Sequence, residues 1–171
     1  MYKRIKMVKV NSDYCDYLRK YDDKVAYNYG IKELRPYIGV LFVINDMEYF
    51  APLSSPKEKH RRLYDSIDLI KIENGELGVI NLNNMIPVTK NNYIEFNLNK
   101  KVNNKSDFLR IVLYKKQLRW LTVNRKDIYF KSSKLYFLYI NNMLAKNIKN
   151  RCCNFKLLEE KCLEYNKELV S

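Results

Sequence analysis

The segment PYIGVLFVINDMEYFAPL, residues 36–53, is the part of this chain that most constrains its fold. Two apolar runs, Ile38–Ile44 and Met47–Leu53, are separated by the pair Asn45-Asp46. Two polar residues of this kind between two such runs are typical of the short turn of a β-hairpin. The sequence therefore predicts an antiparallel hairpin in the first half of the chain.

Further short strands are expected after this hairpin. They are DLIKI (68–72) and LGVINL (77–82) with the turn ENGE between them, then MIPV (85–88) and YIEFNLN (93–99). Apolar residues at helical spacing predict helices over 11–24, from Lys105 onward, over about 125–146 and from near Asn154, with Asn11 or Ser12 and Asn154 as N-caps. The predicted fold class is α+β, with a compact antiparallel sheet or small barrel flanked by helices.

Length and composition indicate one folded domain. The chain has 171 residues, of which 47% are hydrophobic, and its four glycines and four prolines form no linker, so a single domain over 1–171 is expected. No apolar run approaches the roughly 20 residues of a membrane span, and the basic N-terminus lacks the apolar stretch of a signal peptide. Four cysteines without a CxxC pair, beside a single histidine, argue against a structural zinc site and indicate reduced thiols in a cytoplasmic protein.

The net charge is the strongest composition signal. Thirty-two basic residues against 19 acidic ones give +13. A small domain this basic usually binds a polyanion, and nucleic acid is the favoured partner. Two alternatives stay open, namely an anionic membrane surface and the lysine-rich codon bias of an AT-rich genome.

The stretch APLSSPKEKH, residues 51–60, follows the predicted hairpin and carries the candidate chemistry. RNA can be cleaved by its own 2′-hydroxyl, so the protein needs only to align it and to stabilise charge on the phosphate. Ser54 and Ser55 can bind a phosphate oxygen, and Lys57 can neutralise the oxyanion. The alternative is a polar strand exit, in which the serines serve only the turn.

Five segments carry a resemblance to a known family. YLRKYDDKV, RPYIGV, APLSSPKEKH, LGVINLNNMIP and CNFKLLEEK occur in this order. Together they resemble the ToxN/AbiQ family of type III toxin–antitoxin endoribonuclease toxins, with the CptN branch as one candidate. The resemblance spans about residues 10–165 and implies a β core wrapped by helices, similar to MazF-like toxins.

The resemblance also implies an activity. It is sequence-preferring RNA cleavage that needs no metal or other cofactor and leaves a 2′,3′-cyclic phosphate and a 5′-hydroxyl. The implied inhibitor is an antitoxin RNA, cut by the toxin from tandem repeats into pseudoknot units, and three proteins and three RNA units would close a ring. Substrates would be cellular or phage RNA, with growth arrest or abortive infection as the result. A non-catalytic basic RNA-binding module is the alternative function.

Site residues follow from the resemblance and from local chemistry. The resemblance places Ser55, Ser54 and Lys57 in the catalytic loop. It makes Tyr14, Tyr29, Arg35 and Tyr114 candidate RNA-binding residues, and the chain's basic and aromatic side chains add His60, Lys115 and Lys116. Lysines on one helix face would contact the RNA backbone and position the strand. The alternatives are packed core tyrosines at 14 and 114, a capping or partly buried histidine at 60, and a plain strand-start charge at Arg35.

Overall fold

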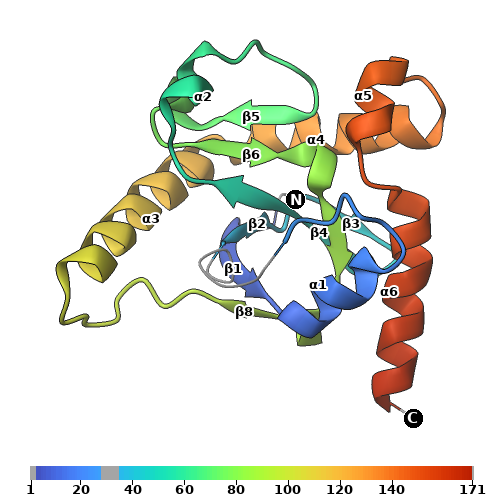
Figure 1. Cartoon of the computed structure of the whole chain (residues 1–171), viewed down its shortest axis with the longest axis horizontal. Helices are drawn as coiled ribbons and strands as arrows, with labels where there is room; N and C mark the ends of the chain where they lie inside the picture. The colour runs from blue at the N-terminus through green and yellow to red at the C-terminus, as the bar shows by residue number, and fades with distance from the viewer. Residues whose placement is uncertain (1–2, 28–34, 171) are drawn as a thin grey trace.

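A computed structural model describes residues 3–27 and 35–170 of the chain (Figure 1). Tyr29, one of the expected RNA-binding residues, lies outside the described residues. The described part combines one antiparallel sheet with helices, as the α+β prediction required. None of the helices in these two ranges is both long and apolar enough to cross a membrane.

Strand β4 (Met47–Ser54) organises the sheet. It pairs with β2 (Tyr37–Gly39), β3 (Val43–Ile44), β6 (Val79–Asn81) and β7 (Ile86–Val88), always antiparallel. The main path of the sheet runs in the order β5 (Leu69–Lys71), β6, β4, β2, β1 (Lys6–Val10) and β8 (Tyr93–Glu95). Because β4 changes partner along its length, the sheet bends around this strand, and Ser54 lies where β4 ends against β6.

The predicted hairpin is present, but its first strand is interrupted. Asn45 and Asp46 both have positive φ, 46° and 65°, as a tight hairpin turn requires. The expected single strand over 38–44 is instead divided into β2 and β3. Between them the chain bends, although Leu41 N still donates to Tyr49 O at 2.9 Å.

The sheet also contains a strand that the sequence analysis did not predict. Strand β1 (Lys6–Val10) pairs with β2 and with β8 (Tyr93–Glu95). Met7, Val8 and Val10 are buried, whereas its lysines are half-buried, so their charges masked the strand pattern. The expected hairpin of DLIKI and LGVINL is confirmed as β5 (Leu69–Lys71) and β6, joined through the turn η2 (Ile72–Gly75), in which Glu73 and Asn74 have positive φ.

The two predicted helix caps are confirmed. The Asn11 side chain accepts hydrogen bonds from Asp13 N and Tyr14 N at the start of α1 (Ser12–Arg19), which is shorter than expected. The Asn154 side chain accepts from Leu157 N at the start of α6 (Phe155–Val170). The carboxylate of Asp22 accepts from Asn154 N at 2.6 Å, so the segment after α1 is held to the start of α6.

The helix expected over 125–146 ends early. The expected range contains α4 (Arg125–Ile140), which follows α3 (Lys105–Val123), and a separate short helix, α5 (Lys146–Arg151), starts where the expected helix would end. Asn142 has φ 55°, and Met143 N donates to Leu138 O at 2.8 Å. This is the Schellman arrangement that closes a helix with asparagine in the left-handed position.

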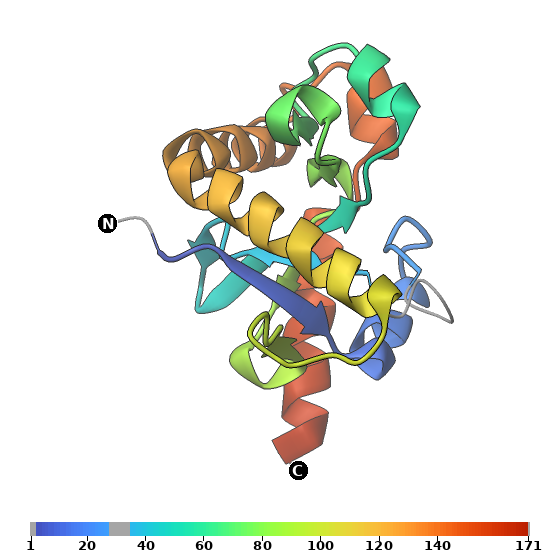
Figure 2. The same cartoon turned by 90° about the vertical axis from the view of Figure 1, so that its left-hand side faces the viewer.

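Helices cover the sheet on different sides. Helix α6 packs on β7 and α1, while α3 lies against η2 and α4 (Figures 1 and 2). The buried carboxylate of Glu159 in α6 accepts hydrogen bonds from Tyr49 of β4 at 2.9 Å and from Tyr136 of α4 at 2.6 Å. These contacts anchor the strand that leads to Ser54.

Candidate active site

The candidate loop begins where β4 ends. Ser54 is half-buried and opposes Val79 of β6, while Ser55, Pro56 and Lys57 are exposed. The five-residue helix α2 (Glu58–Arg62) follows at once. The hydroxyl and amine expected to act on RNA are therefore presented at the end of a buried strand.

Gly78 fixes the path of this loop. Its φ is 106°, and a Cβ at this position would lie 2.2 Å from the carbonyl oxygen of Ser54 and 3.3 Å from Pro56 N. Only a residue without a side chain allows this approach. The backbone of Ser54–Pro56 thus rests directly on the loop that enters β6.

The supporting loop is itself held from two sides. Ile72 N donates to Gly78 O at 2.9 Å, which closes the turn between β5 and β6. From α3, the side-chain amide of Gln117 donates to Leu77 O at 2.7 Å. Gln117 is 1% exposed, so α3 is joined to the supporting loop through a buried contact.

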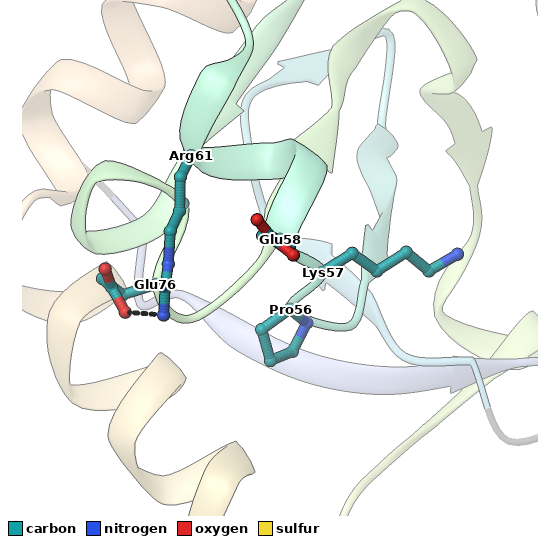
Figure 3. Close-up of a pocket in the computed structure, with 6 residues that line it drawn as sticks. Pro56, Lys57, Glu58, Arg61 and Glu76 are labelled. Carbon is teal, nitrogen blue, oxygen red and sulfur yellow. Dashed lines mark hydrogen bonds and ion pairs between the residues drawn. The ribbon is translucent and has the colours of Figure 1, made fainter.

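A hollow of about 330 Å³ lies beside the loop, lined by Pro56, Lys57, Glu58, Arg61, Gly75 and Glu76. Arg61 and Glu76 form an ion pair at 2.6 Å that joins α2 to the end of η2. Figure 3 shows the Lys57 side chain extending away from this ion pair. Within the described ranges, the Lys57 amine has no hydrogen bond or ion pair, so it is available to an anionic ligand.

His60 lies inside the protein rather than on its surface. It is 3% exposed, and its Nδ1 has no hydrogen-bond partner among the described residues. Burial, together with the charges of Lys59 and Lys57, lowers the pKa of His60, so the ring is neutral at pH 7. A direct contact between His60 and RNA does not fit this burial, and the buried alternative is the one observed.

Tyr14 also belongs to the core. Its ring is fully buried and packs on Tyr165, and its hydroxyl donates to Pro87 O at 2.6 Å. Burial raises its pKa well above the usual value. Tyr14 thus presents no surface to RNA, and a packed core tyrosine, the alternative raised from the sequence, is what the structure contains.

Helix α3 presents one buried and one basic side. Tyr114 is 9% exposed and contacts the ring of Phe96 edge-on at 5.5 Å, and burial raises its pKa. Lys115 and Lys116, which follow it, are both exposed. The expected basic face of this helix is therefore accessible, whereas Tyr114 is buried.

Arg35 lies at the entrance to β2 and is half-buried. Leu53 N donates to Pro36 O at 2.9 Å, so the pairing of β2 with β4 continues toward Arg35. Its backbone therefore lies near the end of β4, in the neighbourhood of Ser54. This places a second cationic residue near the candidate loop.

The sequence analysis missed two polar side chains of the site. The first is Asn81, at the end of β6, which donates through Nδ2 to Ser54 Oγ at 2.9 Å. The second is Gln117 of α3, which donates to Leu77 O. Each is far from its partner in the chain; Asn81 falls within the segment LGVINLNNMIP, whereas Gln117 lies in none of the five quoted segments. For Asn81 the signal was a polar residue closing the apolar strand of that segment, which is common in proteins of every function, and Gln117, inside α3, had no such signal.

Comparison with known proteins identifies relatives along nearly the whole chain. The family model described as "Toxin ToxN, type III toxin-antitoxin system" matches residues 6–163. Endoribonuclease ToxN of Pectobacterium atrosepticum is 34% identical over 172 residues, which cover 96% of this chain and 95% of the relative. Endoribonuclease ToxN of Bacillus thuringiensis subsp. kurstaki is 34% identical over 160 residues, covering 91% and 81%.

A solved structure shares both the fold and the length. It comes from work on bacterial type III toxin–antitoxin systems and selective toxin inhibition by a non-coding RNA pseudoknot. The TM-score is 0.81 at 32% sequence identity, over 96% of this chain and 99% of that one. The similarity therefore extends over nearly the whole of both chains.

Proposed function

Because the chain belongs to the ToxN family of type III toxin–antitoxin toxins, we propose that it is an endoribonuclease whose active site is the loop Ser54–Lys57. One observation carries the assignment of the site. The side chains of Ser55 and Lys57 are exposed and without partners in the described part of the chain, while Gly78 fixes the backbone between them. Free functional groups on an immobile backbone are what alignment of a reacting phosphate requires.

The proposed reaction is an in-line transesterification. The 2′-oxygen of the RNA forms a bond to phosphorus, and the bond from phosphorus to the 5′-oxygen of the next nucleotide breaks. The 2′-hydroxyl loses its proton and the departing 5′-oxygen gains one, which gives a 2′,3′-cyclic phosphate and a 5′-hydroxyl. The nucleophile belongs to the substrate, so the protein's task is to align it and to stabilise charge.

Lys57 and Ser55 take that task in the proposal. The ammonium group of Lys57 offsets the negative charge that builds up on the non-bridging oxygens, and the Ser55 hydroxyl donates to one of them. Arg35 holds a neighbouring phosphate, and Lys115 and Lys116 hold the strand farther along α3. No step of this sequence requires a metal ion, and we propose that the reaction proceeds without one.

The regulating partner is proposed to be RNA. The related structure is described by toxin inhibition through a non-coding RNA pseudoknot, and the charge of +13 suits such a partner here. A repeat-derived antitoxin RNA that stays bound across the loop would block cleavage because it occupies the substrate's place. A ring of three proteins and three RNA units is the proposed assembly, and native mass spectrometry of the co-expressed complex tests it. A mass equal to one protein and one RNA would contradict the ring.

The activity is tested by cleavage of a long RNA with a chelator present. The variants are Ser55→Ala and Lys57→Ala, and their matched controls are Ser106→Ala and Lys90→Ala. Ser106 is exposed in the first turn of α3, and Lys90 is exposed after β7, beyond the Met47 end of β4.

Discrete fragments ending in cyclic phosphate are expected from the wild type and from both controls. Ser55→Ala and Lys57→Ala are expected to lose about 100-fold or more in rate, as for the removal of one group that stabilises a transition-state charge. If all five proteins bind RNA and none cuts it, the chain is an RNA-binding module, and the endoribonuclease proposal fails. If cleavage by the wild type stops with the chelator, only the metal-free reaction is contradicted.

A further inference from the structure

We propose that Asn81 is a positioning residue that holds the Ser54 hydroxyl as a hydrogen-bond donor to the reacting phosphate; this rests on the proposed function. Asn81 Nδ2 donates to Ser54 Oγ at 2.9 Å. A serine hydroxyl has one hydrogen to donate and two lone pairs to accept with. Because the amide occupies a lone pair, the hydroxyl hydrogen must point elsewhere, and no acceptor for it is present among the described residues.

The strand register explains why Asn81 reaches Ser54. Leu53 is opposite Ile80 and Ser54 is opposite Val79, so Asn81 and Ser54 are diagonal neighbours on one face of the β4–β6 pair. Side chains in this relationship lie within reach of each other. Asn81 is in turn paired with Leu69 of β5, so the amide comes from the sheet rather than from a loop.

The two serines of the loop are thereby distinguished. Ser55 is exposed and makes no hydrogen bond to the described residues, so its hydroxyl rotates freely until RNA binds. Ser54 is half-buried, and its oxygen is already fixed by Asn81. A donor that is oriented before the substrate arrives needs no reorganisation as charge develops, and this is the condition under which such donors contribute most to rate.

Asn81 could instead serve only to hold β6 to β4, and the two roles predict different kinetics. A residue that acts through the Ser54 hydroxyl has no effect once that hydroxyl is gone. A residue that only stabilises the strand end slows the reaction by the same factor whether or not the hydroxyl is present. A double-mutant cycle therefore separates the two roles.

The cycle compares the wild type, Asn81→Ala, Ser54→Ala and the double variant, with Asn83→Ala as control. Asn83 lies two residues later and donates to Arg151 O, away from the loop. We expect Asn81→Ala to be about 3- to 10-fold slower and Ser54→Ala about 10- to 100-fold slower, the ranges for a neutral and a charge-assisted hydrogen bond. The double variant should equal Ser54→Ala, and the effect of Asn81→Ala should return in a Ser54→Thr background, which keeps the donor.

A phosphorothioate substrate supplies a readout that strand stabilisation would not move. Sulfur in place of the contacted non-bridging oxygen accepts hydrogen bonds poorly, so the wild type should be slowed by it. The slowing should shrink in Ser54→Ala and in Asn81→Ala, and stay unchanged in the Asn83 control. If Asn81→Ala unfolds at the assay temperature, Asn81→Ser replaces it in the same cycle.

Two failures can be told apart. If the wild type does not cut RNA, the proposed function is wrong, and this inference fails with it. If the wild type cuts RNA while the effects of Asn81→Ala and Ser54→Ala multiply, and the sulfur effect is unchanged, only the role of Asn81 is overturned.

Discussion

The side-chain amide of Gln117, buried in α3, donates to the carbonyl oxygen of Leu77 at 2.7 Å. Leu77 precedes Gly78, on which the backbone of Ser54 rests. The other polar atom of this side chain, Oε1, is buried without a partner among the described residues. This hydrogen bond therefore connects α3, the helix that carries Lys115 and Lys116, to the loop that supports Ser54–Lys57.

Replacing this donor should reduce the stability of the fold. In Gln117→Glu a carboxylate oxygen takes the place of the amide nitrogen and faces the carbonyl of Leu77. We expect the free energy of unfolding to fall by about 2–4 kcal/mol at pH 7, because a buried charge is left without a donor. Urea unfolding measures this. The exposed neighbour Lys116 provides the control, since Lys116→Ala should change stability by less than about 0.5 kcal/mol.

Gly78→Ala tests the contact between the two loops. An alanine at φ 106° is strained, and its Cβ would meet the carbonyl oxygen of Ser54. We expect a loss of about 1–3 kcal/mol in unfolding free energy. RNA cleavage should also slow at temperatures where the variant is fully folded, because the loop is displaced. Full cleavage by a destabilised variant would mean that the loop does not depend on this support.

The pH dependence of stability between about pH 5 and 7 should come from His60 in large part, because it is the single histidine of the chain. Its pKa is lower in the folded protein than the usual value of 6.5. The unfolded chain therefore takes up a proton first as pH falls below about 6.5, and stability declines there until the folded pKa is reached. Thermal unfolding at pH 7.5 and 5.5 should show the decline in the wild type and a smaller one in His60→Gln. Equal declines would contradict the assignment.

Tyr14→Phe separates a core tyrosine from an RNA contact. The change removes the hydroxyl that donates to Pro87 O and leaves a buried acceptor without its partner. We expect a loss of about 1–3 kcal/mol in unfolding free energy, with no change in RNA affinity. Filter binding below the unfolding temperature measures the affinity. Weaker binding by a fully folded Tyr14→Phe would restore Tyr14 as an RNA contact.

Lys115 and Lys116 should act through charge alone. Replacing both by alanine is expected to weaken binding of RNAs of different sequence by a similar factor, because lysine contacts to phosphate carry no sequence information. With single-stranded RNA, the slope of log affinity against log salt should fall by about 0.7 for each phosphate that a lysine no longer neutralises. An unchanged slope would place the RNA on another face.

Local sequence patterns determined much of the fold. The Asn45-Asp46 turn, the Asn11 and Asn154 caps and the hairpin around Gly75 were predictable because each depends on residues adjacent in the chain. Strand β1 was not, since Lys6 and Lys9 interrupt its apolar residues and make the segment look like a solvated basic tail, although both lysines are half-buried. The break before α5 depends on Asn142 adopting φ 55°, which an asparagine permits but does not require.

The site was predictable in part for a related reason. The loop Ser54–Lys57 is contiguous, so its chemistry could be proposed from the sequence and its family resemblance. Asn81 and Gln117 reach it from β6 and α3, and only the folded arrangement brings them there. The sequence did not decide whether Tyr14 and His60 are buried or exposed, because a tyrosine or a histidine suits both positions.

The partner changes of β4 also limit how this site can vary. Side chains alternate between the two faces of a strand, so one inserted or deleted residue would move every side chain beyond it to the opposite face and shift its pairing by one residue. In β4 that shift would disturb pairings with four other strands at once. The strand can therefore accept substitutions but not a change of length. New RNA preferences in descendants of this chain should arise in the segment after Ser54 and on the helices around it, at a fixed distance from the Asn45-Asp46 turn.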